Sequence, residues 1–241
     1  TVTVTVEVLN GTSTPVPGAV VEFAVNNSTY GSGLPARIFT NDAGYATAVF
    51  KPGTTSGDVT FTATVAQDDS LKTSVDLGIN HATPYRIANI WYLPEVTVGE
   101  KTNITVRIED QYKNAVDNRN ETETVSFMVG SPNGTAVFNN TADDNVAVSV
   151  DATGNATATL WVDTMAGEHL IYIQPPAPVR SDYISLFSVA GQPFDITAAV
   201  DPDDASVRAN GEDKVSFTYT LFDKYGNPSP GQGLWVNAST K

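Results

Sequence analysis

The chain of 241 residues contains no cysteine and only two histidines, His81 and His169. The absence of cysteine excludes disulfides, thiolate metal sites, iron–sulfur clusters and cysteine nucleophiles. With two histidines, most metal-dependent and general-base chemistry also lacks its usual residues. The sequence therefore predicts a protein that is not an enzyme.

Basic residues are also scarce, since 13 Lys and Arg stand against 27 Asp and Glu and the net charge is -14. Such a charge repels nucleic acid and anionic membrane surfaces. No apolar run reaches the length of a membrane span, and no secretory signal is recognisable. We expect no nucleic-acid partner and no direct membrane insertion by this segment.

The residues that are abundant favour β-structure. Apolar residues make up 41% of the chain, which also contains 30 Thr and 16 Ser. Residues 1–8 and 59–65 alternate strictly between apolar and polar side chains, as antiparallel strands with one wet face do. No helical period persists for three turns. We predict an all-β protein with these core residues: Val4, Val6, Phe23, Phe61, Ile104, Val106, Phe127 and Leu160.

Four sequence elements recur at intervals of a little over a hundred residues, which indicates a tandem repeat. Asn10 to Gly18 aligns without gaps on Asp223 to Gly231, and Asp110 to Val116 is a middle copy. Both Gly44 and Gly154 lie where a hairpin needs a positive φ angle. The matching segments are 10–18, 110–116 and 223–231; 40–49 and 150–159; 54–57 and 163–167; and 84–87 and 193–196.

At these residues the sequence resembles the invasin and intimin type of bacterial Ig-like domain, group 1. The resemblance covers nearly the whole chain and is strongest at 4–65 and 212–236. It is looser at 84–174, where the turn at 115–118 lacks the prolines and the glycine of the family pattern. The resemblance implies Ig-like β-sandwiches strung in tandem on the outside of prokaryotic cells. Its motifs specify turns, so they support architecture better than function.

The repeats divide the chain into three expected units: 1–80 without a first strand, 84–190 as a complete unit, and 193–241 as the first part of a third. We therefore expect a piece of a longer chain in which Phe217, Tyr219 and Leu221, or their alternating neighbours, stand exposed. The linkers are 79–83 and, after the prolines at 175, 176 and 178, the stretch 181–192. Short connections stiffened by proline predict tandem antiparallel β-sandwiches arranged as a semi-rigid rod.

Nine Asn-x-Ser/Thr sequons occur, against about three or four expected by chance in a chain so rich in Thr. Several lie at predicted turns where a glycan would be accessible, although Thr-rich β proteins also produce sequons incidentally. Together with the acidic, cysteine-free composition they favour an extracellular, cell-surface glycoprotein of a prokaryote, with an archaeal source preferred. The candidate acceptors are Asn10, Asn26, Asn27, Asn103, Asn120, Asn133, Asn139, Asn155 and Asn237.

Asp201, Asp203 and Asp204 are the candidate metal ligands, because clustered carboxylates are the hard oxygen ligands that Ca²⁺ prefers. Their spacing matches no EF-hand, and the alternative is a solvated acidic turn that keeps the surface soluble. No other cofactor is expected.

Trp91, Tyr92, Trp161 and Trp235 offer a possible sugar-stacking platform. Trp161 and Trp235 continue alternating strands, however. We therefore favour the alternative that the tryptophans close cores or contacts between units.

Two functions remain. The first is a structural part of the cell surface, in a surface layer, sheath or stalk, whose partners are further repeats of the chain and like subunits in an array or filament. The alternative is an adhesin or carbohydrate-binding module that contacts a partner cell or glycan. An exposed aromatic cluster on one domain only would favour the alternative.

Overall fold

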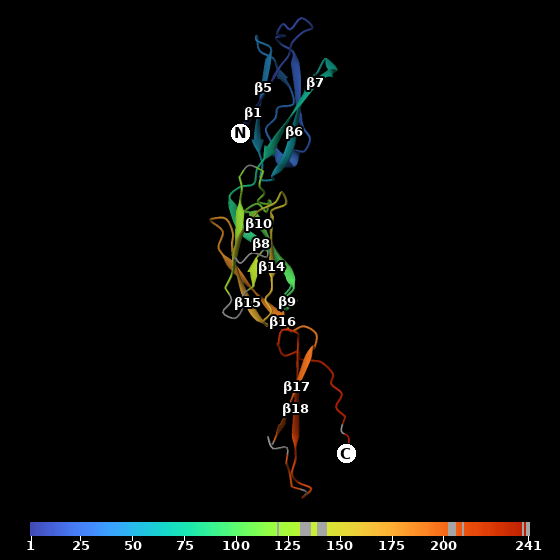
Figure 1. Ribbon diagram of the computed structural model, residues 1–241. Coiled ribbons are helices and arrows are strands. Elements are labelled where there is room, and N and C mark those ends of the chain that lie inside the picture. Colours follow the sequence, from blue (N-terminus) through green and yellow to red (C-terminus); the bar gives the residue numbers. More distant parts are fainter. Residues whose placement is uncertain are drawn as a thin grey trace. The chain divides into compact units, whose positions relative to one another are not determined.

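The computed structural model describes residues 1–119, 121–130, 136–138, 144–201, 206–208, 210–237 and 239. As predicted, the described residues form strands and loops, apart from one 3₁₀ turn, η1 (Ser28–Tyr30) (Figure 1). Spatial contacts divide the chain into two compact parts, of which the first comprises Thr1–Ala88, Ile108–Glu123 and Val150–Gly154 and the second the remainder. In the described part of the chain, no helix has the length and hydropathy of a membrane span.

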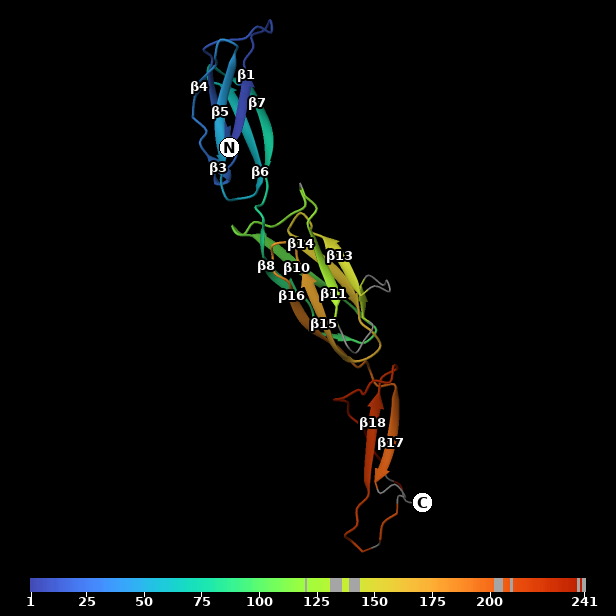
Figure 2. The ribbon, with the colours of Figure 1, turned by 90° about the vertical axis from the view of Figure 1, so that its left-hand side faces the viewer.

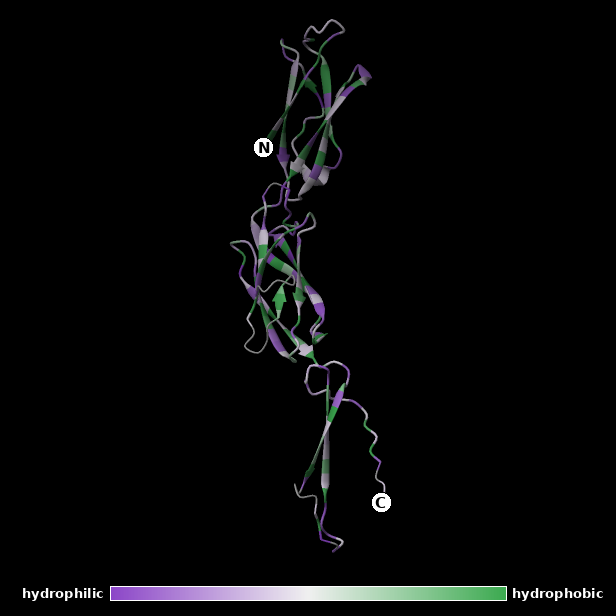
Figure 3. Ribbon diagram, in the orientation of Figure 1, coloured by the Kyte–Doolittle hydropathy of each residue, from purple (hydrophilic) through white to green (hydrophobic). Residues whose placement is uncertain are grey.

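The first sandwich consists of two antiparallel sheets (Figure 2). Along its strands the ribbon changes repeatedly between hydrophobic and hydrophilic residues (Figure 3). The three-stranded sheet has the order β1 (Val2–Glu7), β5 (Tyr45–Pro52), β3 (Gly31–Ser32). The four-stranded sheet has the order β4 (Ile38–Phe39), β2 (Val20–Val25), β6 (Gly57–Val65), β7 (Asp68–Ile79).

The core of the first sandwich is closed by an edge-to-face pair of rings. Phe50 on β5 and Phe61 on β6 are buried, with ring centroids 4.9 Å apart at 83°. Phe23 is buried as predicted, whereas Val4 and Val6 are only partly buried because β1 is an edge strand. The alternation thus assigns the correct face to every valine of β1 but not its degree of burial.

A groove of about 260 Å³ opens between β1 and β7, the edge strands of the two sheets. Apolar side chains such as Val6, Val21 and Leu71 line it. In the second sandwich, the strands that correspond to β1 and β7 are not edges, because two further strands pair with them.

The second sandwich has the same plan with two more strands. Its four-stranded sheet has the order β12 (Val137–Phe138), β14 (Asn155–Trp161), β10 (Lys101–Asp110), β8 (Pro84–Trp91). Its five-stranded sheet has the order β13 (Asn145–Ser149), β11 (Thr124–Val129), β15 (Gly167–Gln174), β16 (Asp182–Val189), β9 (Glu95–Thr97). Strand β9 runs parallel to β16, and the other paired strands with a determined register are antiparallel.

The core of the second sandwich confirms the predicted register. Ile104, Val106, Phe127 and Leu160 are all fully buried. Phe127 on β11 faces Phe138 of the opposite sheet, with ring centroids 6.1 Å apart.

The prediction that 181–192 is a linker is wrong, because Asp182–Val189 forms strand β16. Ile184 and Leu186 of this strand are buried, while Tyr183 and Phe187 point to the outer face. The three prolines lie in the loop between β15 and β16, not between two units. Proline clusters mark loops of either kind, so they cannot by themselves locate a boundary.

Strands β17 (Asp195–Asp201) and β18 (Ser216–Phe222) form a separate two-stranded antiparallel sheet. Phe217 is 62% exposed and Tyr219 37%, as the sequence predicts, whereas Leu221 is half-buried. Among the described residues after β16, the buried side chains include Asp223 and Ser229 but no apolar residue.

Residues 193–241 should therefore be cleaved by thermolysin well before 84–190. A two-stranded sheet is marginally stable in water, since it buries too little apolar surface to resist local opening. Limited proteolysis of the 241-residue chain, followed by mass spectrometry, measures the order of cleavage. Resistance of 193–241 in a sample shown to be monomeric would contradict this expectation.

Candidate functional site

The repeated turn motif has the same geometry in all three copies. In each, an Asn or Asp side-chain oxygen, Oδ1, accepts hydrogen bonds from the backbone N–H groups two and four residues later, which is the Asx geometry that these residues favour in turns. The copies are Asn10 with Thr12 and Thr14 (3.0 and 3.0 Å), Asp110 with Tyr112 and Asn114 (2.8 and 2.9 Å), and Asp223 with Tyr225 and Asn227 (2.9 and 2.9 Å).

The position before the last residue of this turn needs a left-handed backbone. Gly226 has φ +86° there, and Ser13 and Lys113 adopt +59° and +71° despite their side chains. The Gly154 hairpin packs against the second copy, and a Cβ atom on Gly154 would lie 2.9 Å from Cβ of Ala115. The glycine thus serves a close approach between two turns as well as a positive φ angle of +82°.

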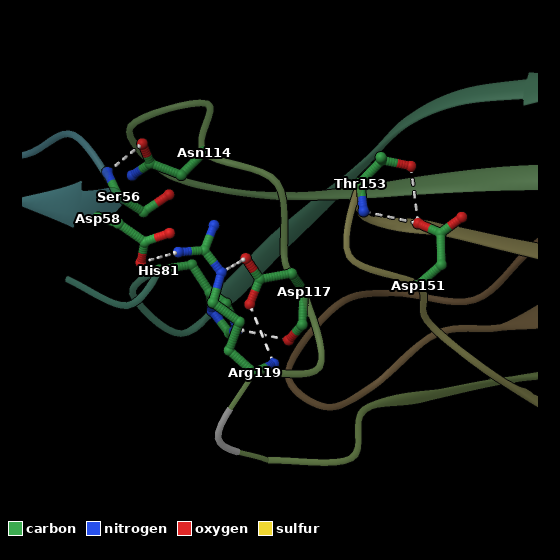
Figure 4. Close-up of polar contacts among 8 residues, drawn as sticks. All are labelled: Ser56, Asp58, His81, Asn114, Asp117, Arg119, Asp151 and Thr153. Carbon is green, nitrogen blue, oxygen red and sulfur yellow. Dashed lines mark hydrogen bonds and ion pairs between the residues drawn. The ribbon is translucent and has the colours of Figure 1, made fainter. Parts of the chain in front are cut away.

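Asn114 connects the second sandwich to the loop between β5 and β6, within the first compact part of the chain (Figure 4). Its Nδ2 donates to the carbonyl oxygen of Thr54 at 2.8 Å, and its Oδ1 accepts from the N–H of Ser56 at 2.9 Å. The side-chain amide pairs with the backbone of that loop as another peptide group would.

Asn227 makes the same two-point contact within the second compact part. Its Nδ2 donates to the carbonyl oxygen of Thr164 at 2.7 Å, and its Oδ1 accepts from the N–H of Ala166 at 2.8 Å. Thr54 and Thr164 occupy matching positions of the sequence repeat, so the amide contact is itself repeated. We call each of these two contacts a junction clasp.

A buried carboxylate supports the first junction clasp. Asp110 is 1% exposed, and its Oδ2 accepts from Asn114 Nδ2 and from the N–H of Ala82 in the linker, both at 2.8 Å. Burial by itself would raise the pKa of Asp110, but hydrogen bonds from the Asn114 side chain and from three backbone N–H groups outweigh it and hold the pKa below its ordinary value.

Asp223 repeats this arrangement at the second clasp. It is 2% exposed, and its Oδ2 accepts from Asn227 Nδ2 and from the N–H of Gly191, both at 2.9 Å. Burial again opposes ionisation, yet the hydrogen bonds from Asn227, Gly191 and Tyr225 prevail and lower the pKa of Asp223 to about 2.

The second clasp should consequently weaken in acid. Because its folded pKa lies below the value of about 3.9 for an unfolded Asp, ionised Asp223 contributes stability above about pH 4 that is lost as the pH falls through about 2. Carbon NMR of the Asp223 carboxyl group should show a midpoint near 2. The free energy of unfolding of the parent chain should exceed that of Asp223→Asn at pH 6, and this difference should shrink as the pH falls from 4 to 2. An unchanged difference over that range would contradict the assignment.

The first clasp has additional polar contacts. Arg119 donates to Asp117 Oδ2 at 2.9 Å and to Asp58 Oδ1 of β6 at 3.0 Å (Figure 4). His81 places its two ring nitrogens 2.7 and 3.1 Å from the carbonyl oxygens of Ala82 and Asp117. The side chain of Asp58 is 79% exposed, so its ion pair adds little stability.

His169 is a packed core residue. It is 1% exposed on β15, and its Nε2 lies 3.0 Å from Ser188 Oγ. Burial lowers the pKa of His169, and the charge of Asp163 opposes this shift.

Six of the nine candidate glycosylation sites lie among the described residues. Asn10, Asn26, Asn27, Asn103 and Asn237 are exposed, whereas Asn155 is half-buried at the start of β14. Asn120, Asn133 and Asn139 lie outside the described residues. Accessibility therefore favours the first five as acceptors, and their glycosylation stays a prediction.

The candidate calcium ligands are only partly described. Asp201 is exposed at the end of β17, and Asp203 and Asp204 lie outside the described residues. Among the residues that the structure describes, no three His, Asp or Glu side chains lie close enough to hold a metal ion. The calcium site also stays a prediction.

The expectation that the tryptophans close cores is wrong, and the alternative that they form contacts between units stays a prediction. Trp91 is 49% exposed and Trp235 fully exposed. Trp161 is half-buried on the outer face of its sheet, with Lys101 Nζ 5.4 Å above its ring centroid. Continuing an alternating strand places a residue on one of two faces, and here it is the outer one.

Sequence reasoning assigned the repeated turns to the fold and missed the junction clasps. The last position of the turn is Asn in the second and third copies and Thr14 in the first. The repeated Asn is the feature of the sequence that points to a contact beyond the turn. An amide can both donate and accept, whereas a turn alone requires neither.

No protein-family model matches the chain. The inverse autotransporter adhesin YeeJ of Escherichia coli K12 is 24% identical over 231 residues, and the match covers 93% of this chain but 9% of YeeJ. The structure of FdeC, an Escherichia coli adhesin, superimposes with a TM-score of 0.60 at 20% identity, covering 91% of this chain and 68% of that one. Invasin, a bacterial integrin-binding protein, superimposes with a TM-score of 0.50 at 20% identity, covering 96% and 44%. These structural similarities establish the fold.

Proposed function

Because the chain is built of Ig-like domains of the invasin and intimin type, we propose that it is a stalk segment of a cell-surface adhesin, in which the junction clasps fasten successive units. The curated relative is an adhesin, which favours this alternative over a surface-layer role. The expected cell-surface location and the absence of an enzymatic role agree with the description of these relatives as adhesins.

The repetition of the clasp carries the proposal. The same amide pairs with the same loop position in two places 113 residues apart, Asn114 and Asn227. A turn that served only its own sandwich would need no partner in the preceding one. We further propose the division into the units 1–80, 84–190 and 193–241, whose partners are further repeats of the same chain.

An exposed row of side chains supports an adhesive setting. Met128, Tyr172 and Tyr183 are cross-strand neighbours on the outer face of the five-stranded sheet, 47%, 43% and 61% exposed. The two tyrosine rings lie 6.3 Å apart. Tyr and Met are enriched in protein interfaces, so this row is a contact surface of the kind that favours adhesion over a purely structural role.

The clasps can be tested by small-angle X-ray scattering of the 241-residue chain. Replacing Asn114 and Asn227 together by Ala removes both amide contacts, so we expect a broader distribution of interatomic distances than in the parent chain. Asn89→Ala, at an exposed position of β8, is the matched control and should leave the distribution unchanged. Identical scattering from all three proteins would refute a fastening role.

The proposed adhesin role is tested with bacteria that display the full-length parent protein. Bacteria that display it should adhere to cultured epithelial cells better than the same strain without it. Replacing residues 1–241 by an equal number of unrelated Ig-like units should preserve adhesion if the segment is a spacer. Adhesion no better than that of the strain lacking the protein would refute the proposed function.

A further inference from the structure

The outer face of the second sandwich contains a groove of about 510 Å³ between the end of β8 and strand β10. Trp91, Tyr92 and Leu93 form one side, and the side chains of Lys101, Asn103 and Thr105 contribute to the other. All of these residues belong to the second compact part of the chain. The groove is separate from both junction clasps, and the stalk role makes no use of it.

The aromatic side of the groove is held open to solvent. Trp91 is 49% and Leu93 60% exposed, at the point where β8 ends and the chain crosses to the other sheet. An exposed indole face next to polar groups suits the C–H face of a pyranose ring, because such a ring is apolar on its faces and polar at its rim.

The polar side of the groove offers donors. Asn103 Oδ1 already accepts from Thr159 Oγ1 at 2.9 Å, and the hydroxyl groups of Thr105 and Thr157 are paired at 2.9 Å. Within the described residues, Asn103 Nδ2 has no hydrogen-bond partner, so both of its hydrogens are available. A ligand in this groove must therefore bring acceptors.

The charge of the groove indicates which kind of acceptor group the ligand contains. Lys101 is a lining residue, and no Asp or Glu is among the described residues that line the groove, although the chain has 27 acidic residues against 13 basic ones. Lys101 rests above the Trp161 ring, its cross-strand partner, which restricts the position of the ammonium group. A cation beside a free amide suits a carboxylate.

From these contacts we propose that the groove binds an acidic saccharide, with a pyranose ring against Trp91 and a carboxylate held by Lys101 and Asn103 Nδ2. The ligand class is a glycan that contains uronic acid or a comparable acidic sugar. This site would give the segment a direct contact with a glycan-coated surface, beyond its role as a spacer.

The test is calorimetric titration of the 241-residue chain, made in a host that does not glycosylate it, because a glycan on Asn103 would occupy the same amide nitrogen. The probes are a tetrasaccharide of alternating N-acetylglucosamine and glucuronic acid and the neutral chitotetraose. The acidic probe should bind at least about tenfold more tightly. Equal affinity for both, or no binding of either, would overturn the proposal.

Two variants locate the binding within the groove. Trp91→Ala removes the stacking face, and Asn103→Asp keeps the acceptor for Thr159 while replacing the donor by a charge. Each should weaken binding of the acidic probe at least about tenfold. Tyr183→Ala, on the outer face of the other sheet, should not change it, and thermal unfolding confirms that each variant is folded. Binding that survives Trp91→Ala in a folded protein but not Tyr183→Ala would place the site elsewhere and refute the proposal. Comparing bacteria with and without the full-length protein does not depend on this result, so the adhesin role and the groove can fail separately; only the replacement of residues 1–241 would also remove the groove.

Discussion

Replacing Phe127 with Ala should lower the free energy of unfolding of the second sandwich by about 3–5 kcal/mol. Phe127 lies on β11, which pairs with β13 and β15, and its side chain is fully buried and faces Phe138 of the opposite sheet. Truncation removes this contact and leaves a cavity that two hydrogen-bonded sheets can close only in part. Chemical denaturation of the 241-residue chain, followed by the tryptophan fluorescence of the second sandwich, measures the change.

Phe187→Ala is the matched control for this substitution. Phe187 lies on β16 of the same sheet but is 47% exposed on its outer face. The same change of side chain should cost less than about 1 kcal/mol there. Equal costs at Phe127 and Phe187 would contradict the assignment of faces in this sheet.

Asp110→Ala should destabilise the first clasp and its turn by about 3 kcal/mol. The buried carboxylate is the common acceptor of the N–H groups of Ala82, Tyr112 and Asn114 and of the Asn114 side-chain amide. Removing it leaves these donors without their common acceptor, and each unpaired buried donor has a desolvation cost.

Denaturant titration at neutral pH measures this loss, and amide hydrogen exchange at Ala82 and Asn114 reports where it occurs. Asp151→Ala is the control, because the exposed Asp151 likewise caps a turn, accepting from the N–H and the hydroxyl of Thr153 at 2.7 Å (Figure 4). It should cost about 1 kcal/mol or less. A loss at Asp110 no larger than at Asp151 would mean that the buried carboxylate has no special structural role.

Strand identity and the inner face of most strands could be predicted because both depend on local alternation. Val106, Phe127 and Leu160 lie inside as their period-two patterns require. Ile184 and Leu186 of strand β16 also alternate with outward residues, but the proline-rich loop before this strand has the composition of a linker. Local composition could not tell a loop inside a sandwich from a connection between two.

The all-β class, the turn positions and the repeat can be predicted from the amino-acid sequence, because alternation and turn chemistry act over a few neighbouring residues. What the turns contact and which aromatic residues remain exposed depend on the packing of the folded chain. The Asn114 amide meets the backbone at Thr54 and Ser56, which lie far from it in the sequence, and Trp91 forms a groove with the neighbouring strand β10. Such contacts depend on how folded strands and loops are brought together, and no pattern of adjacent residues contains that information.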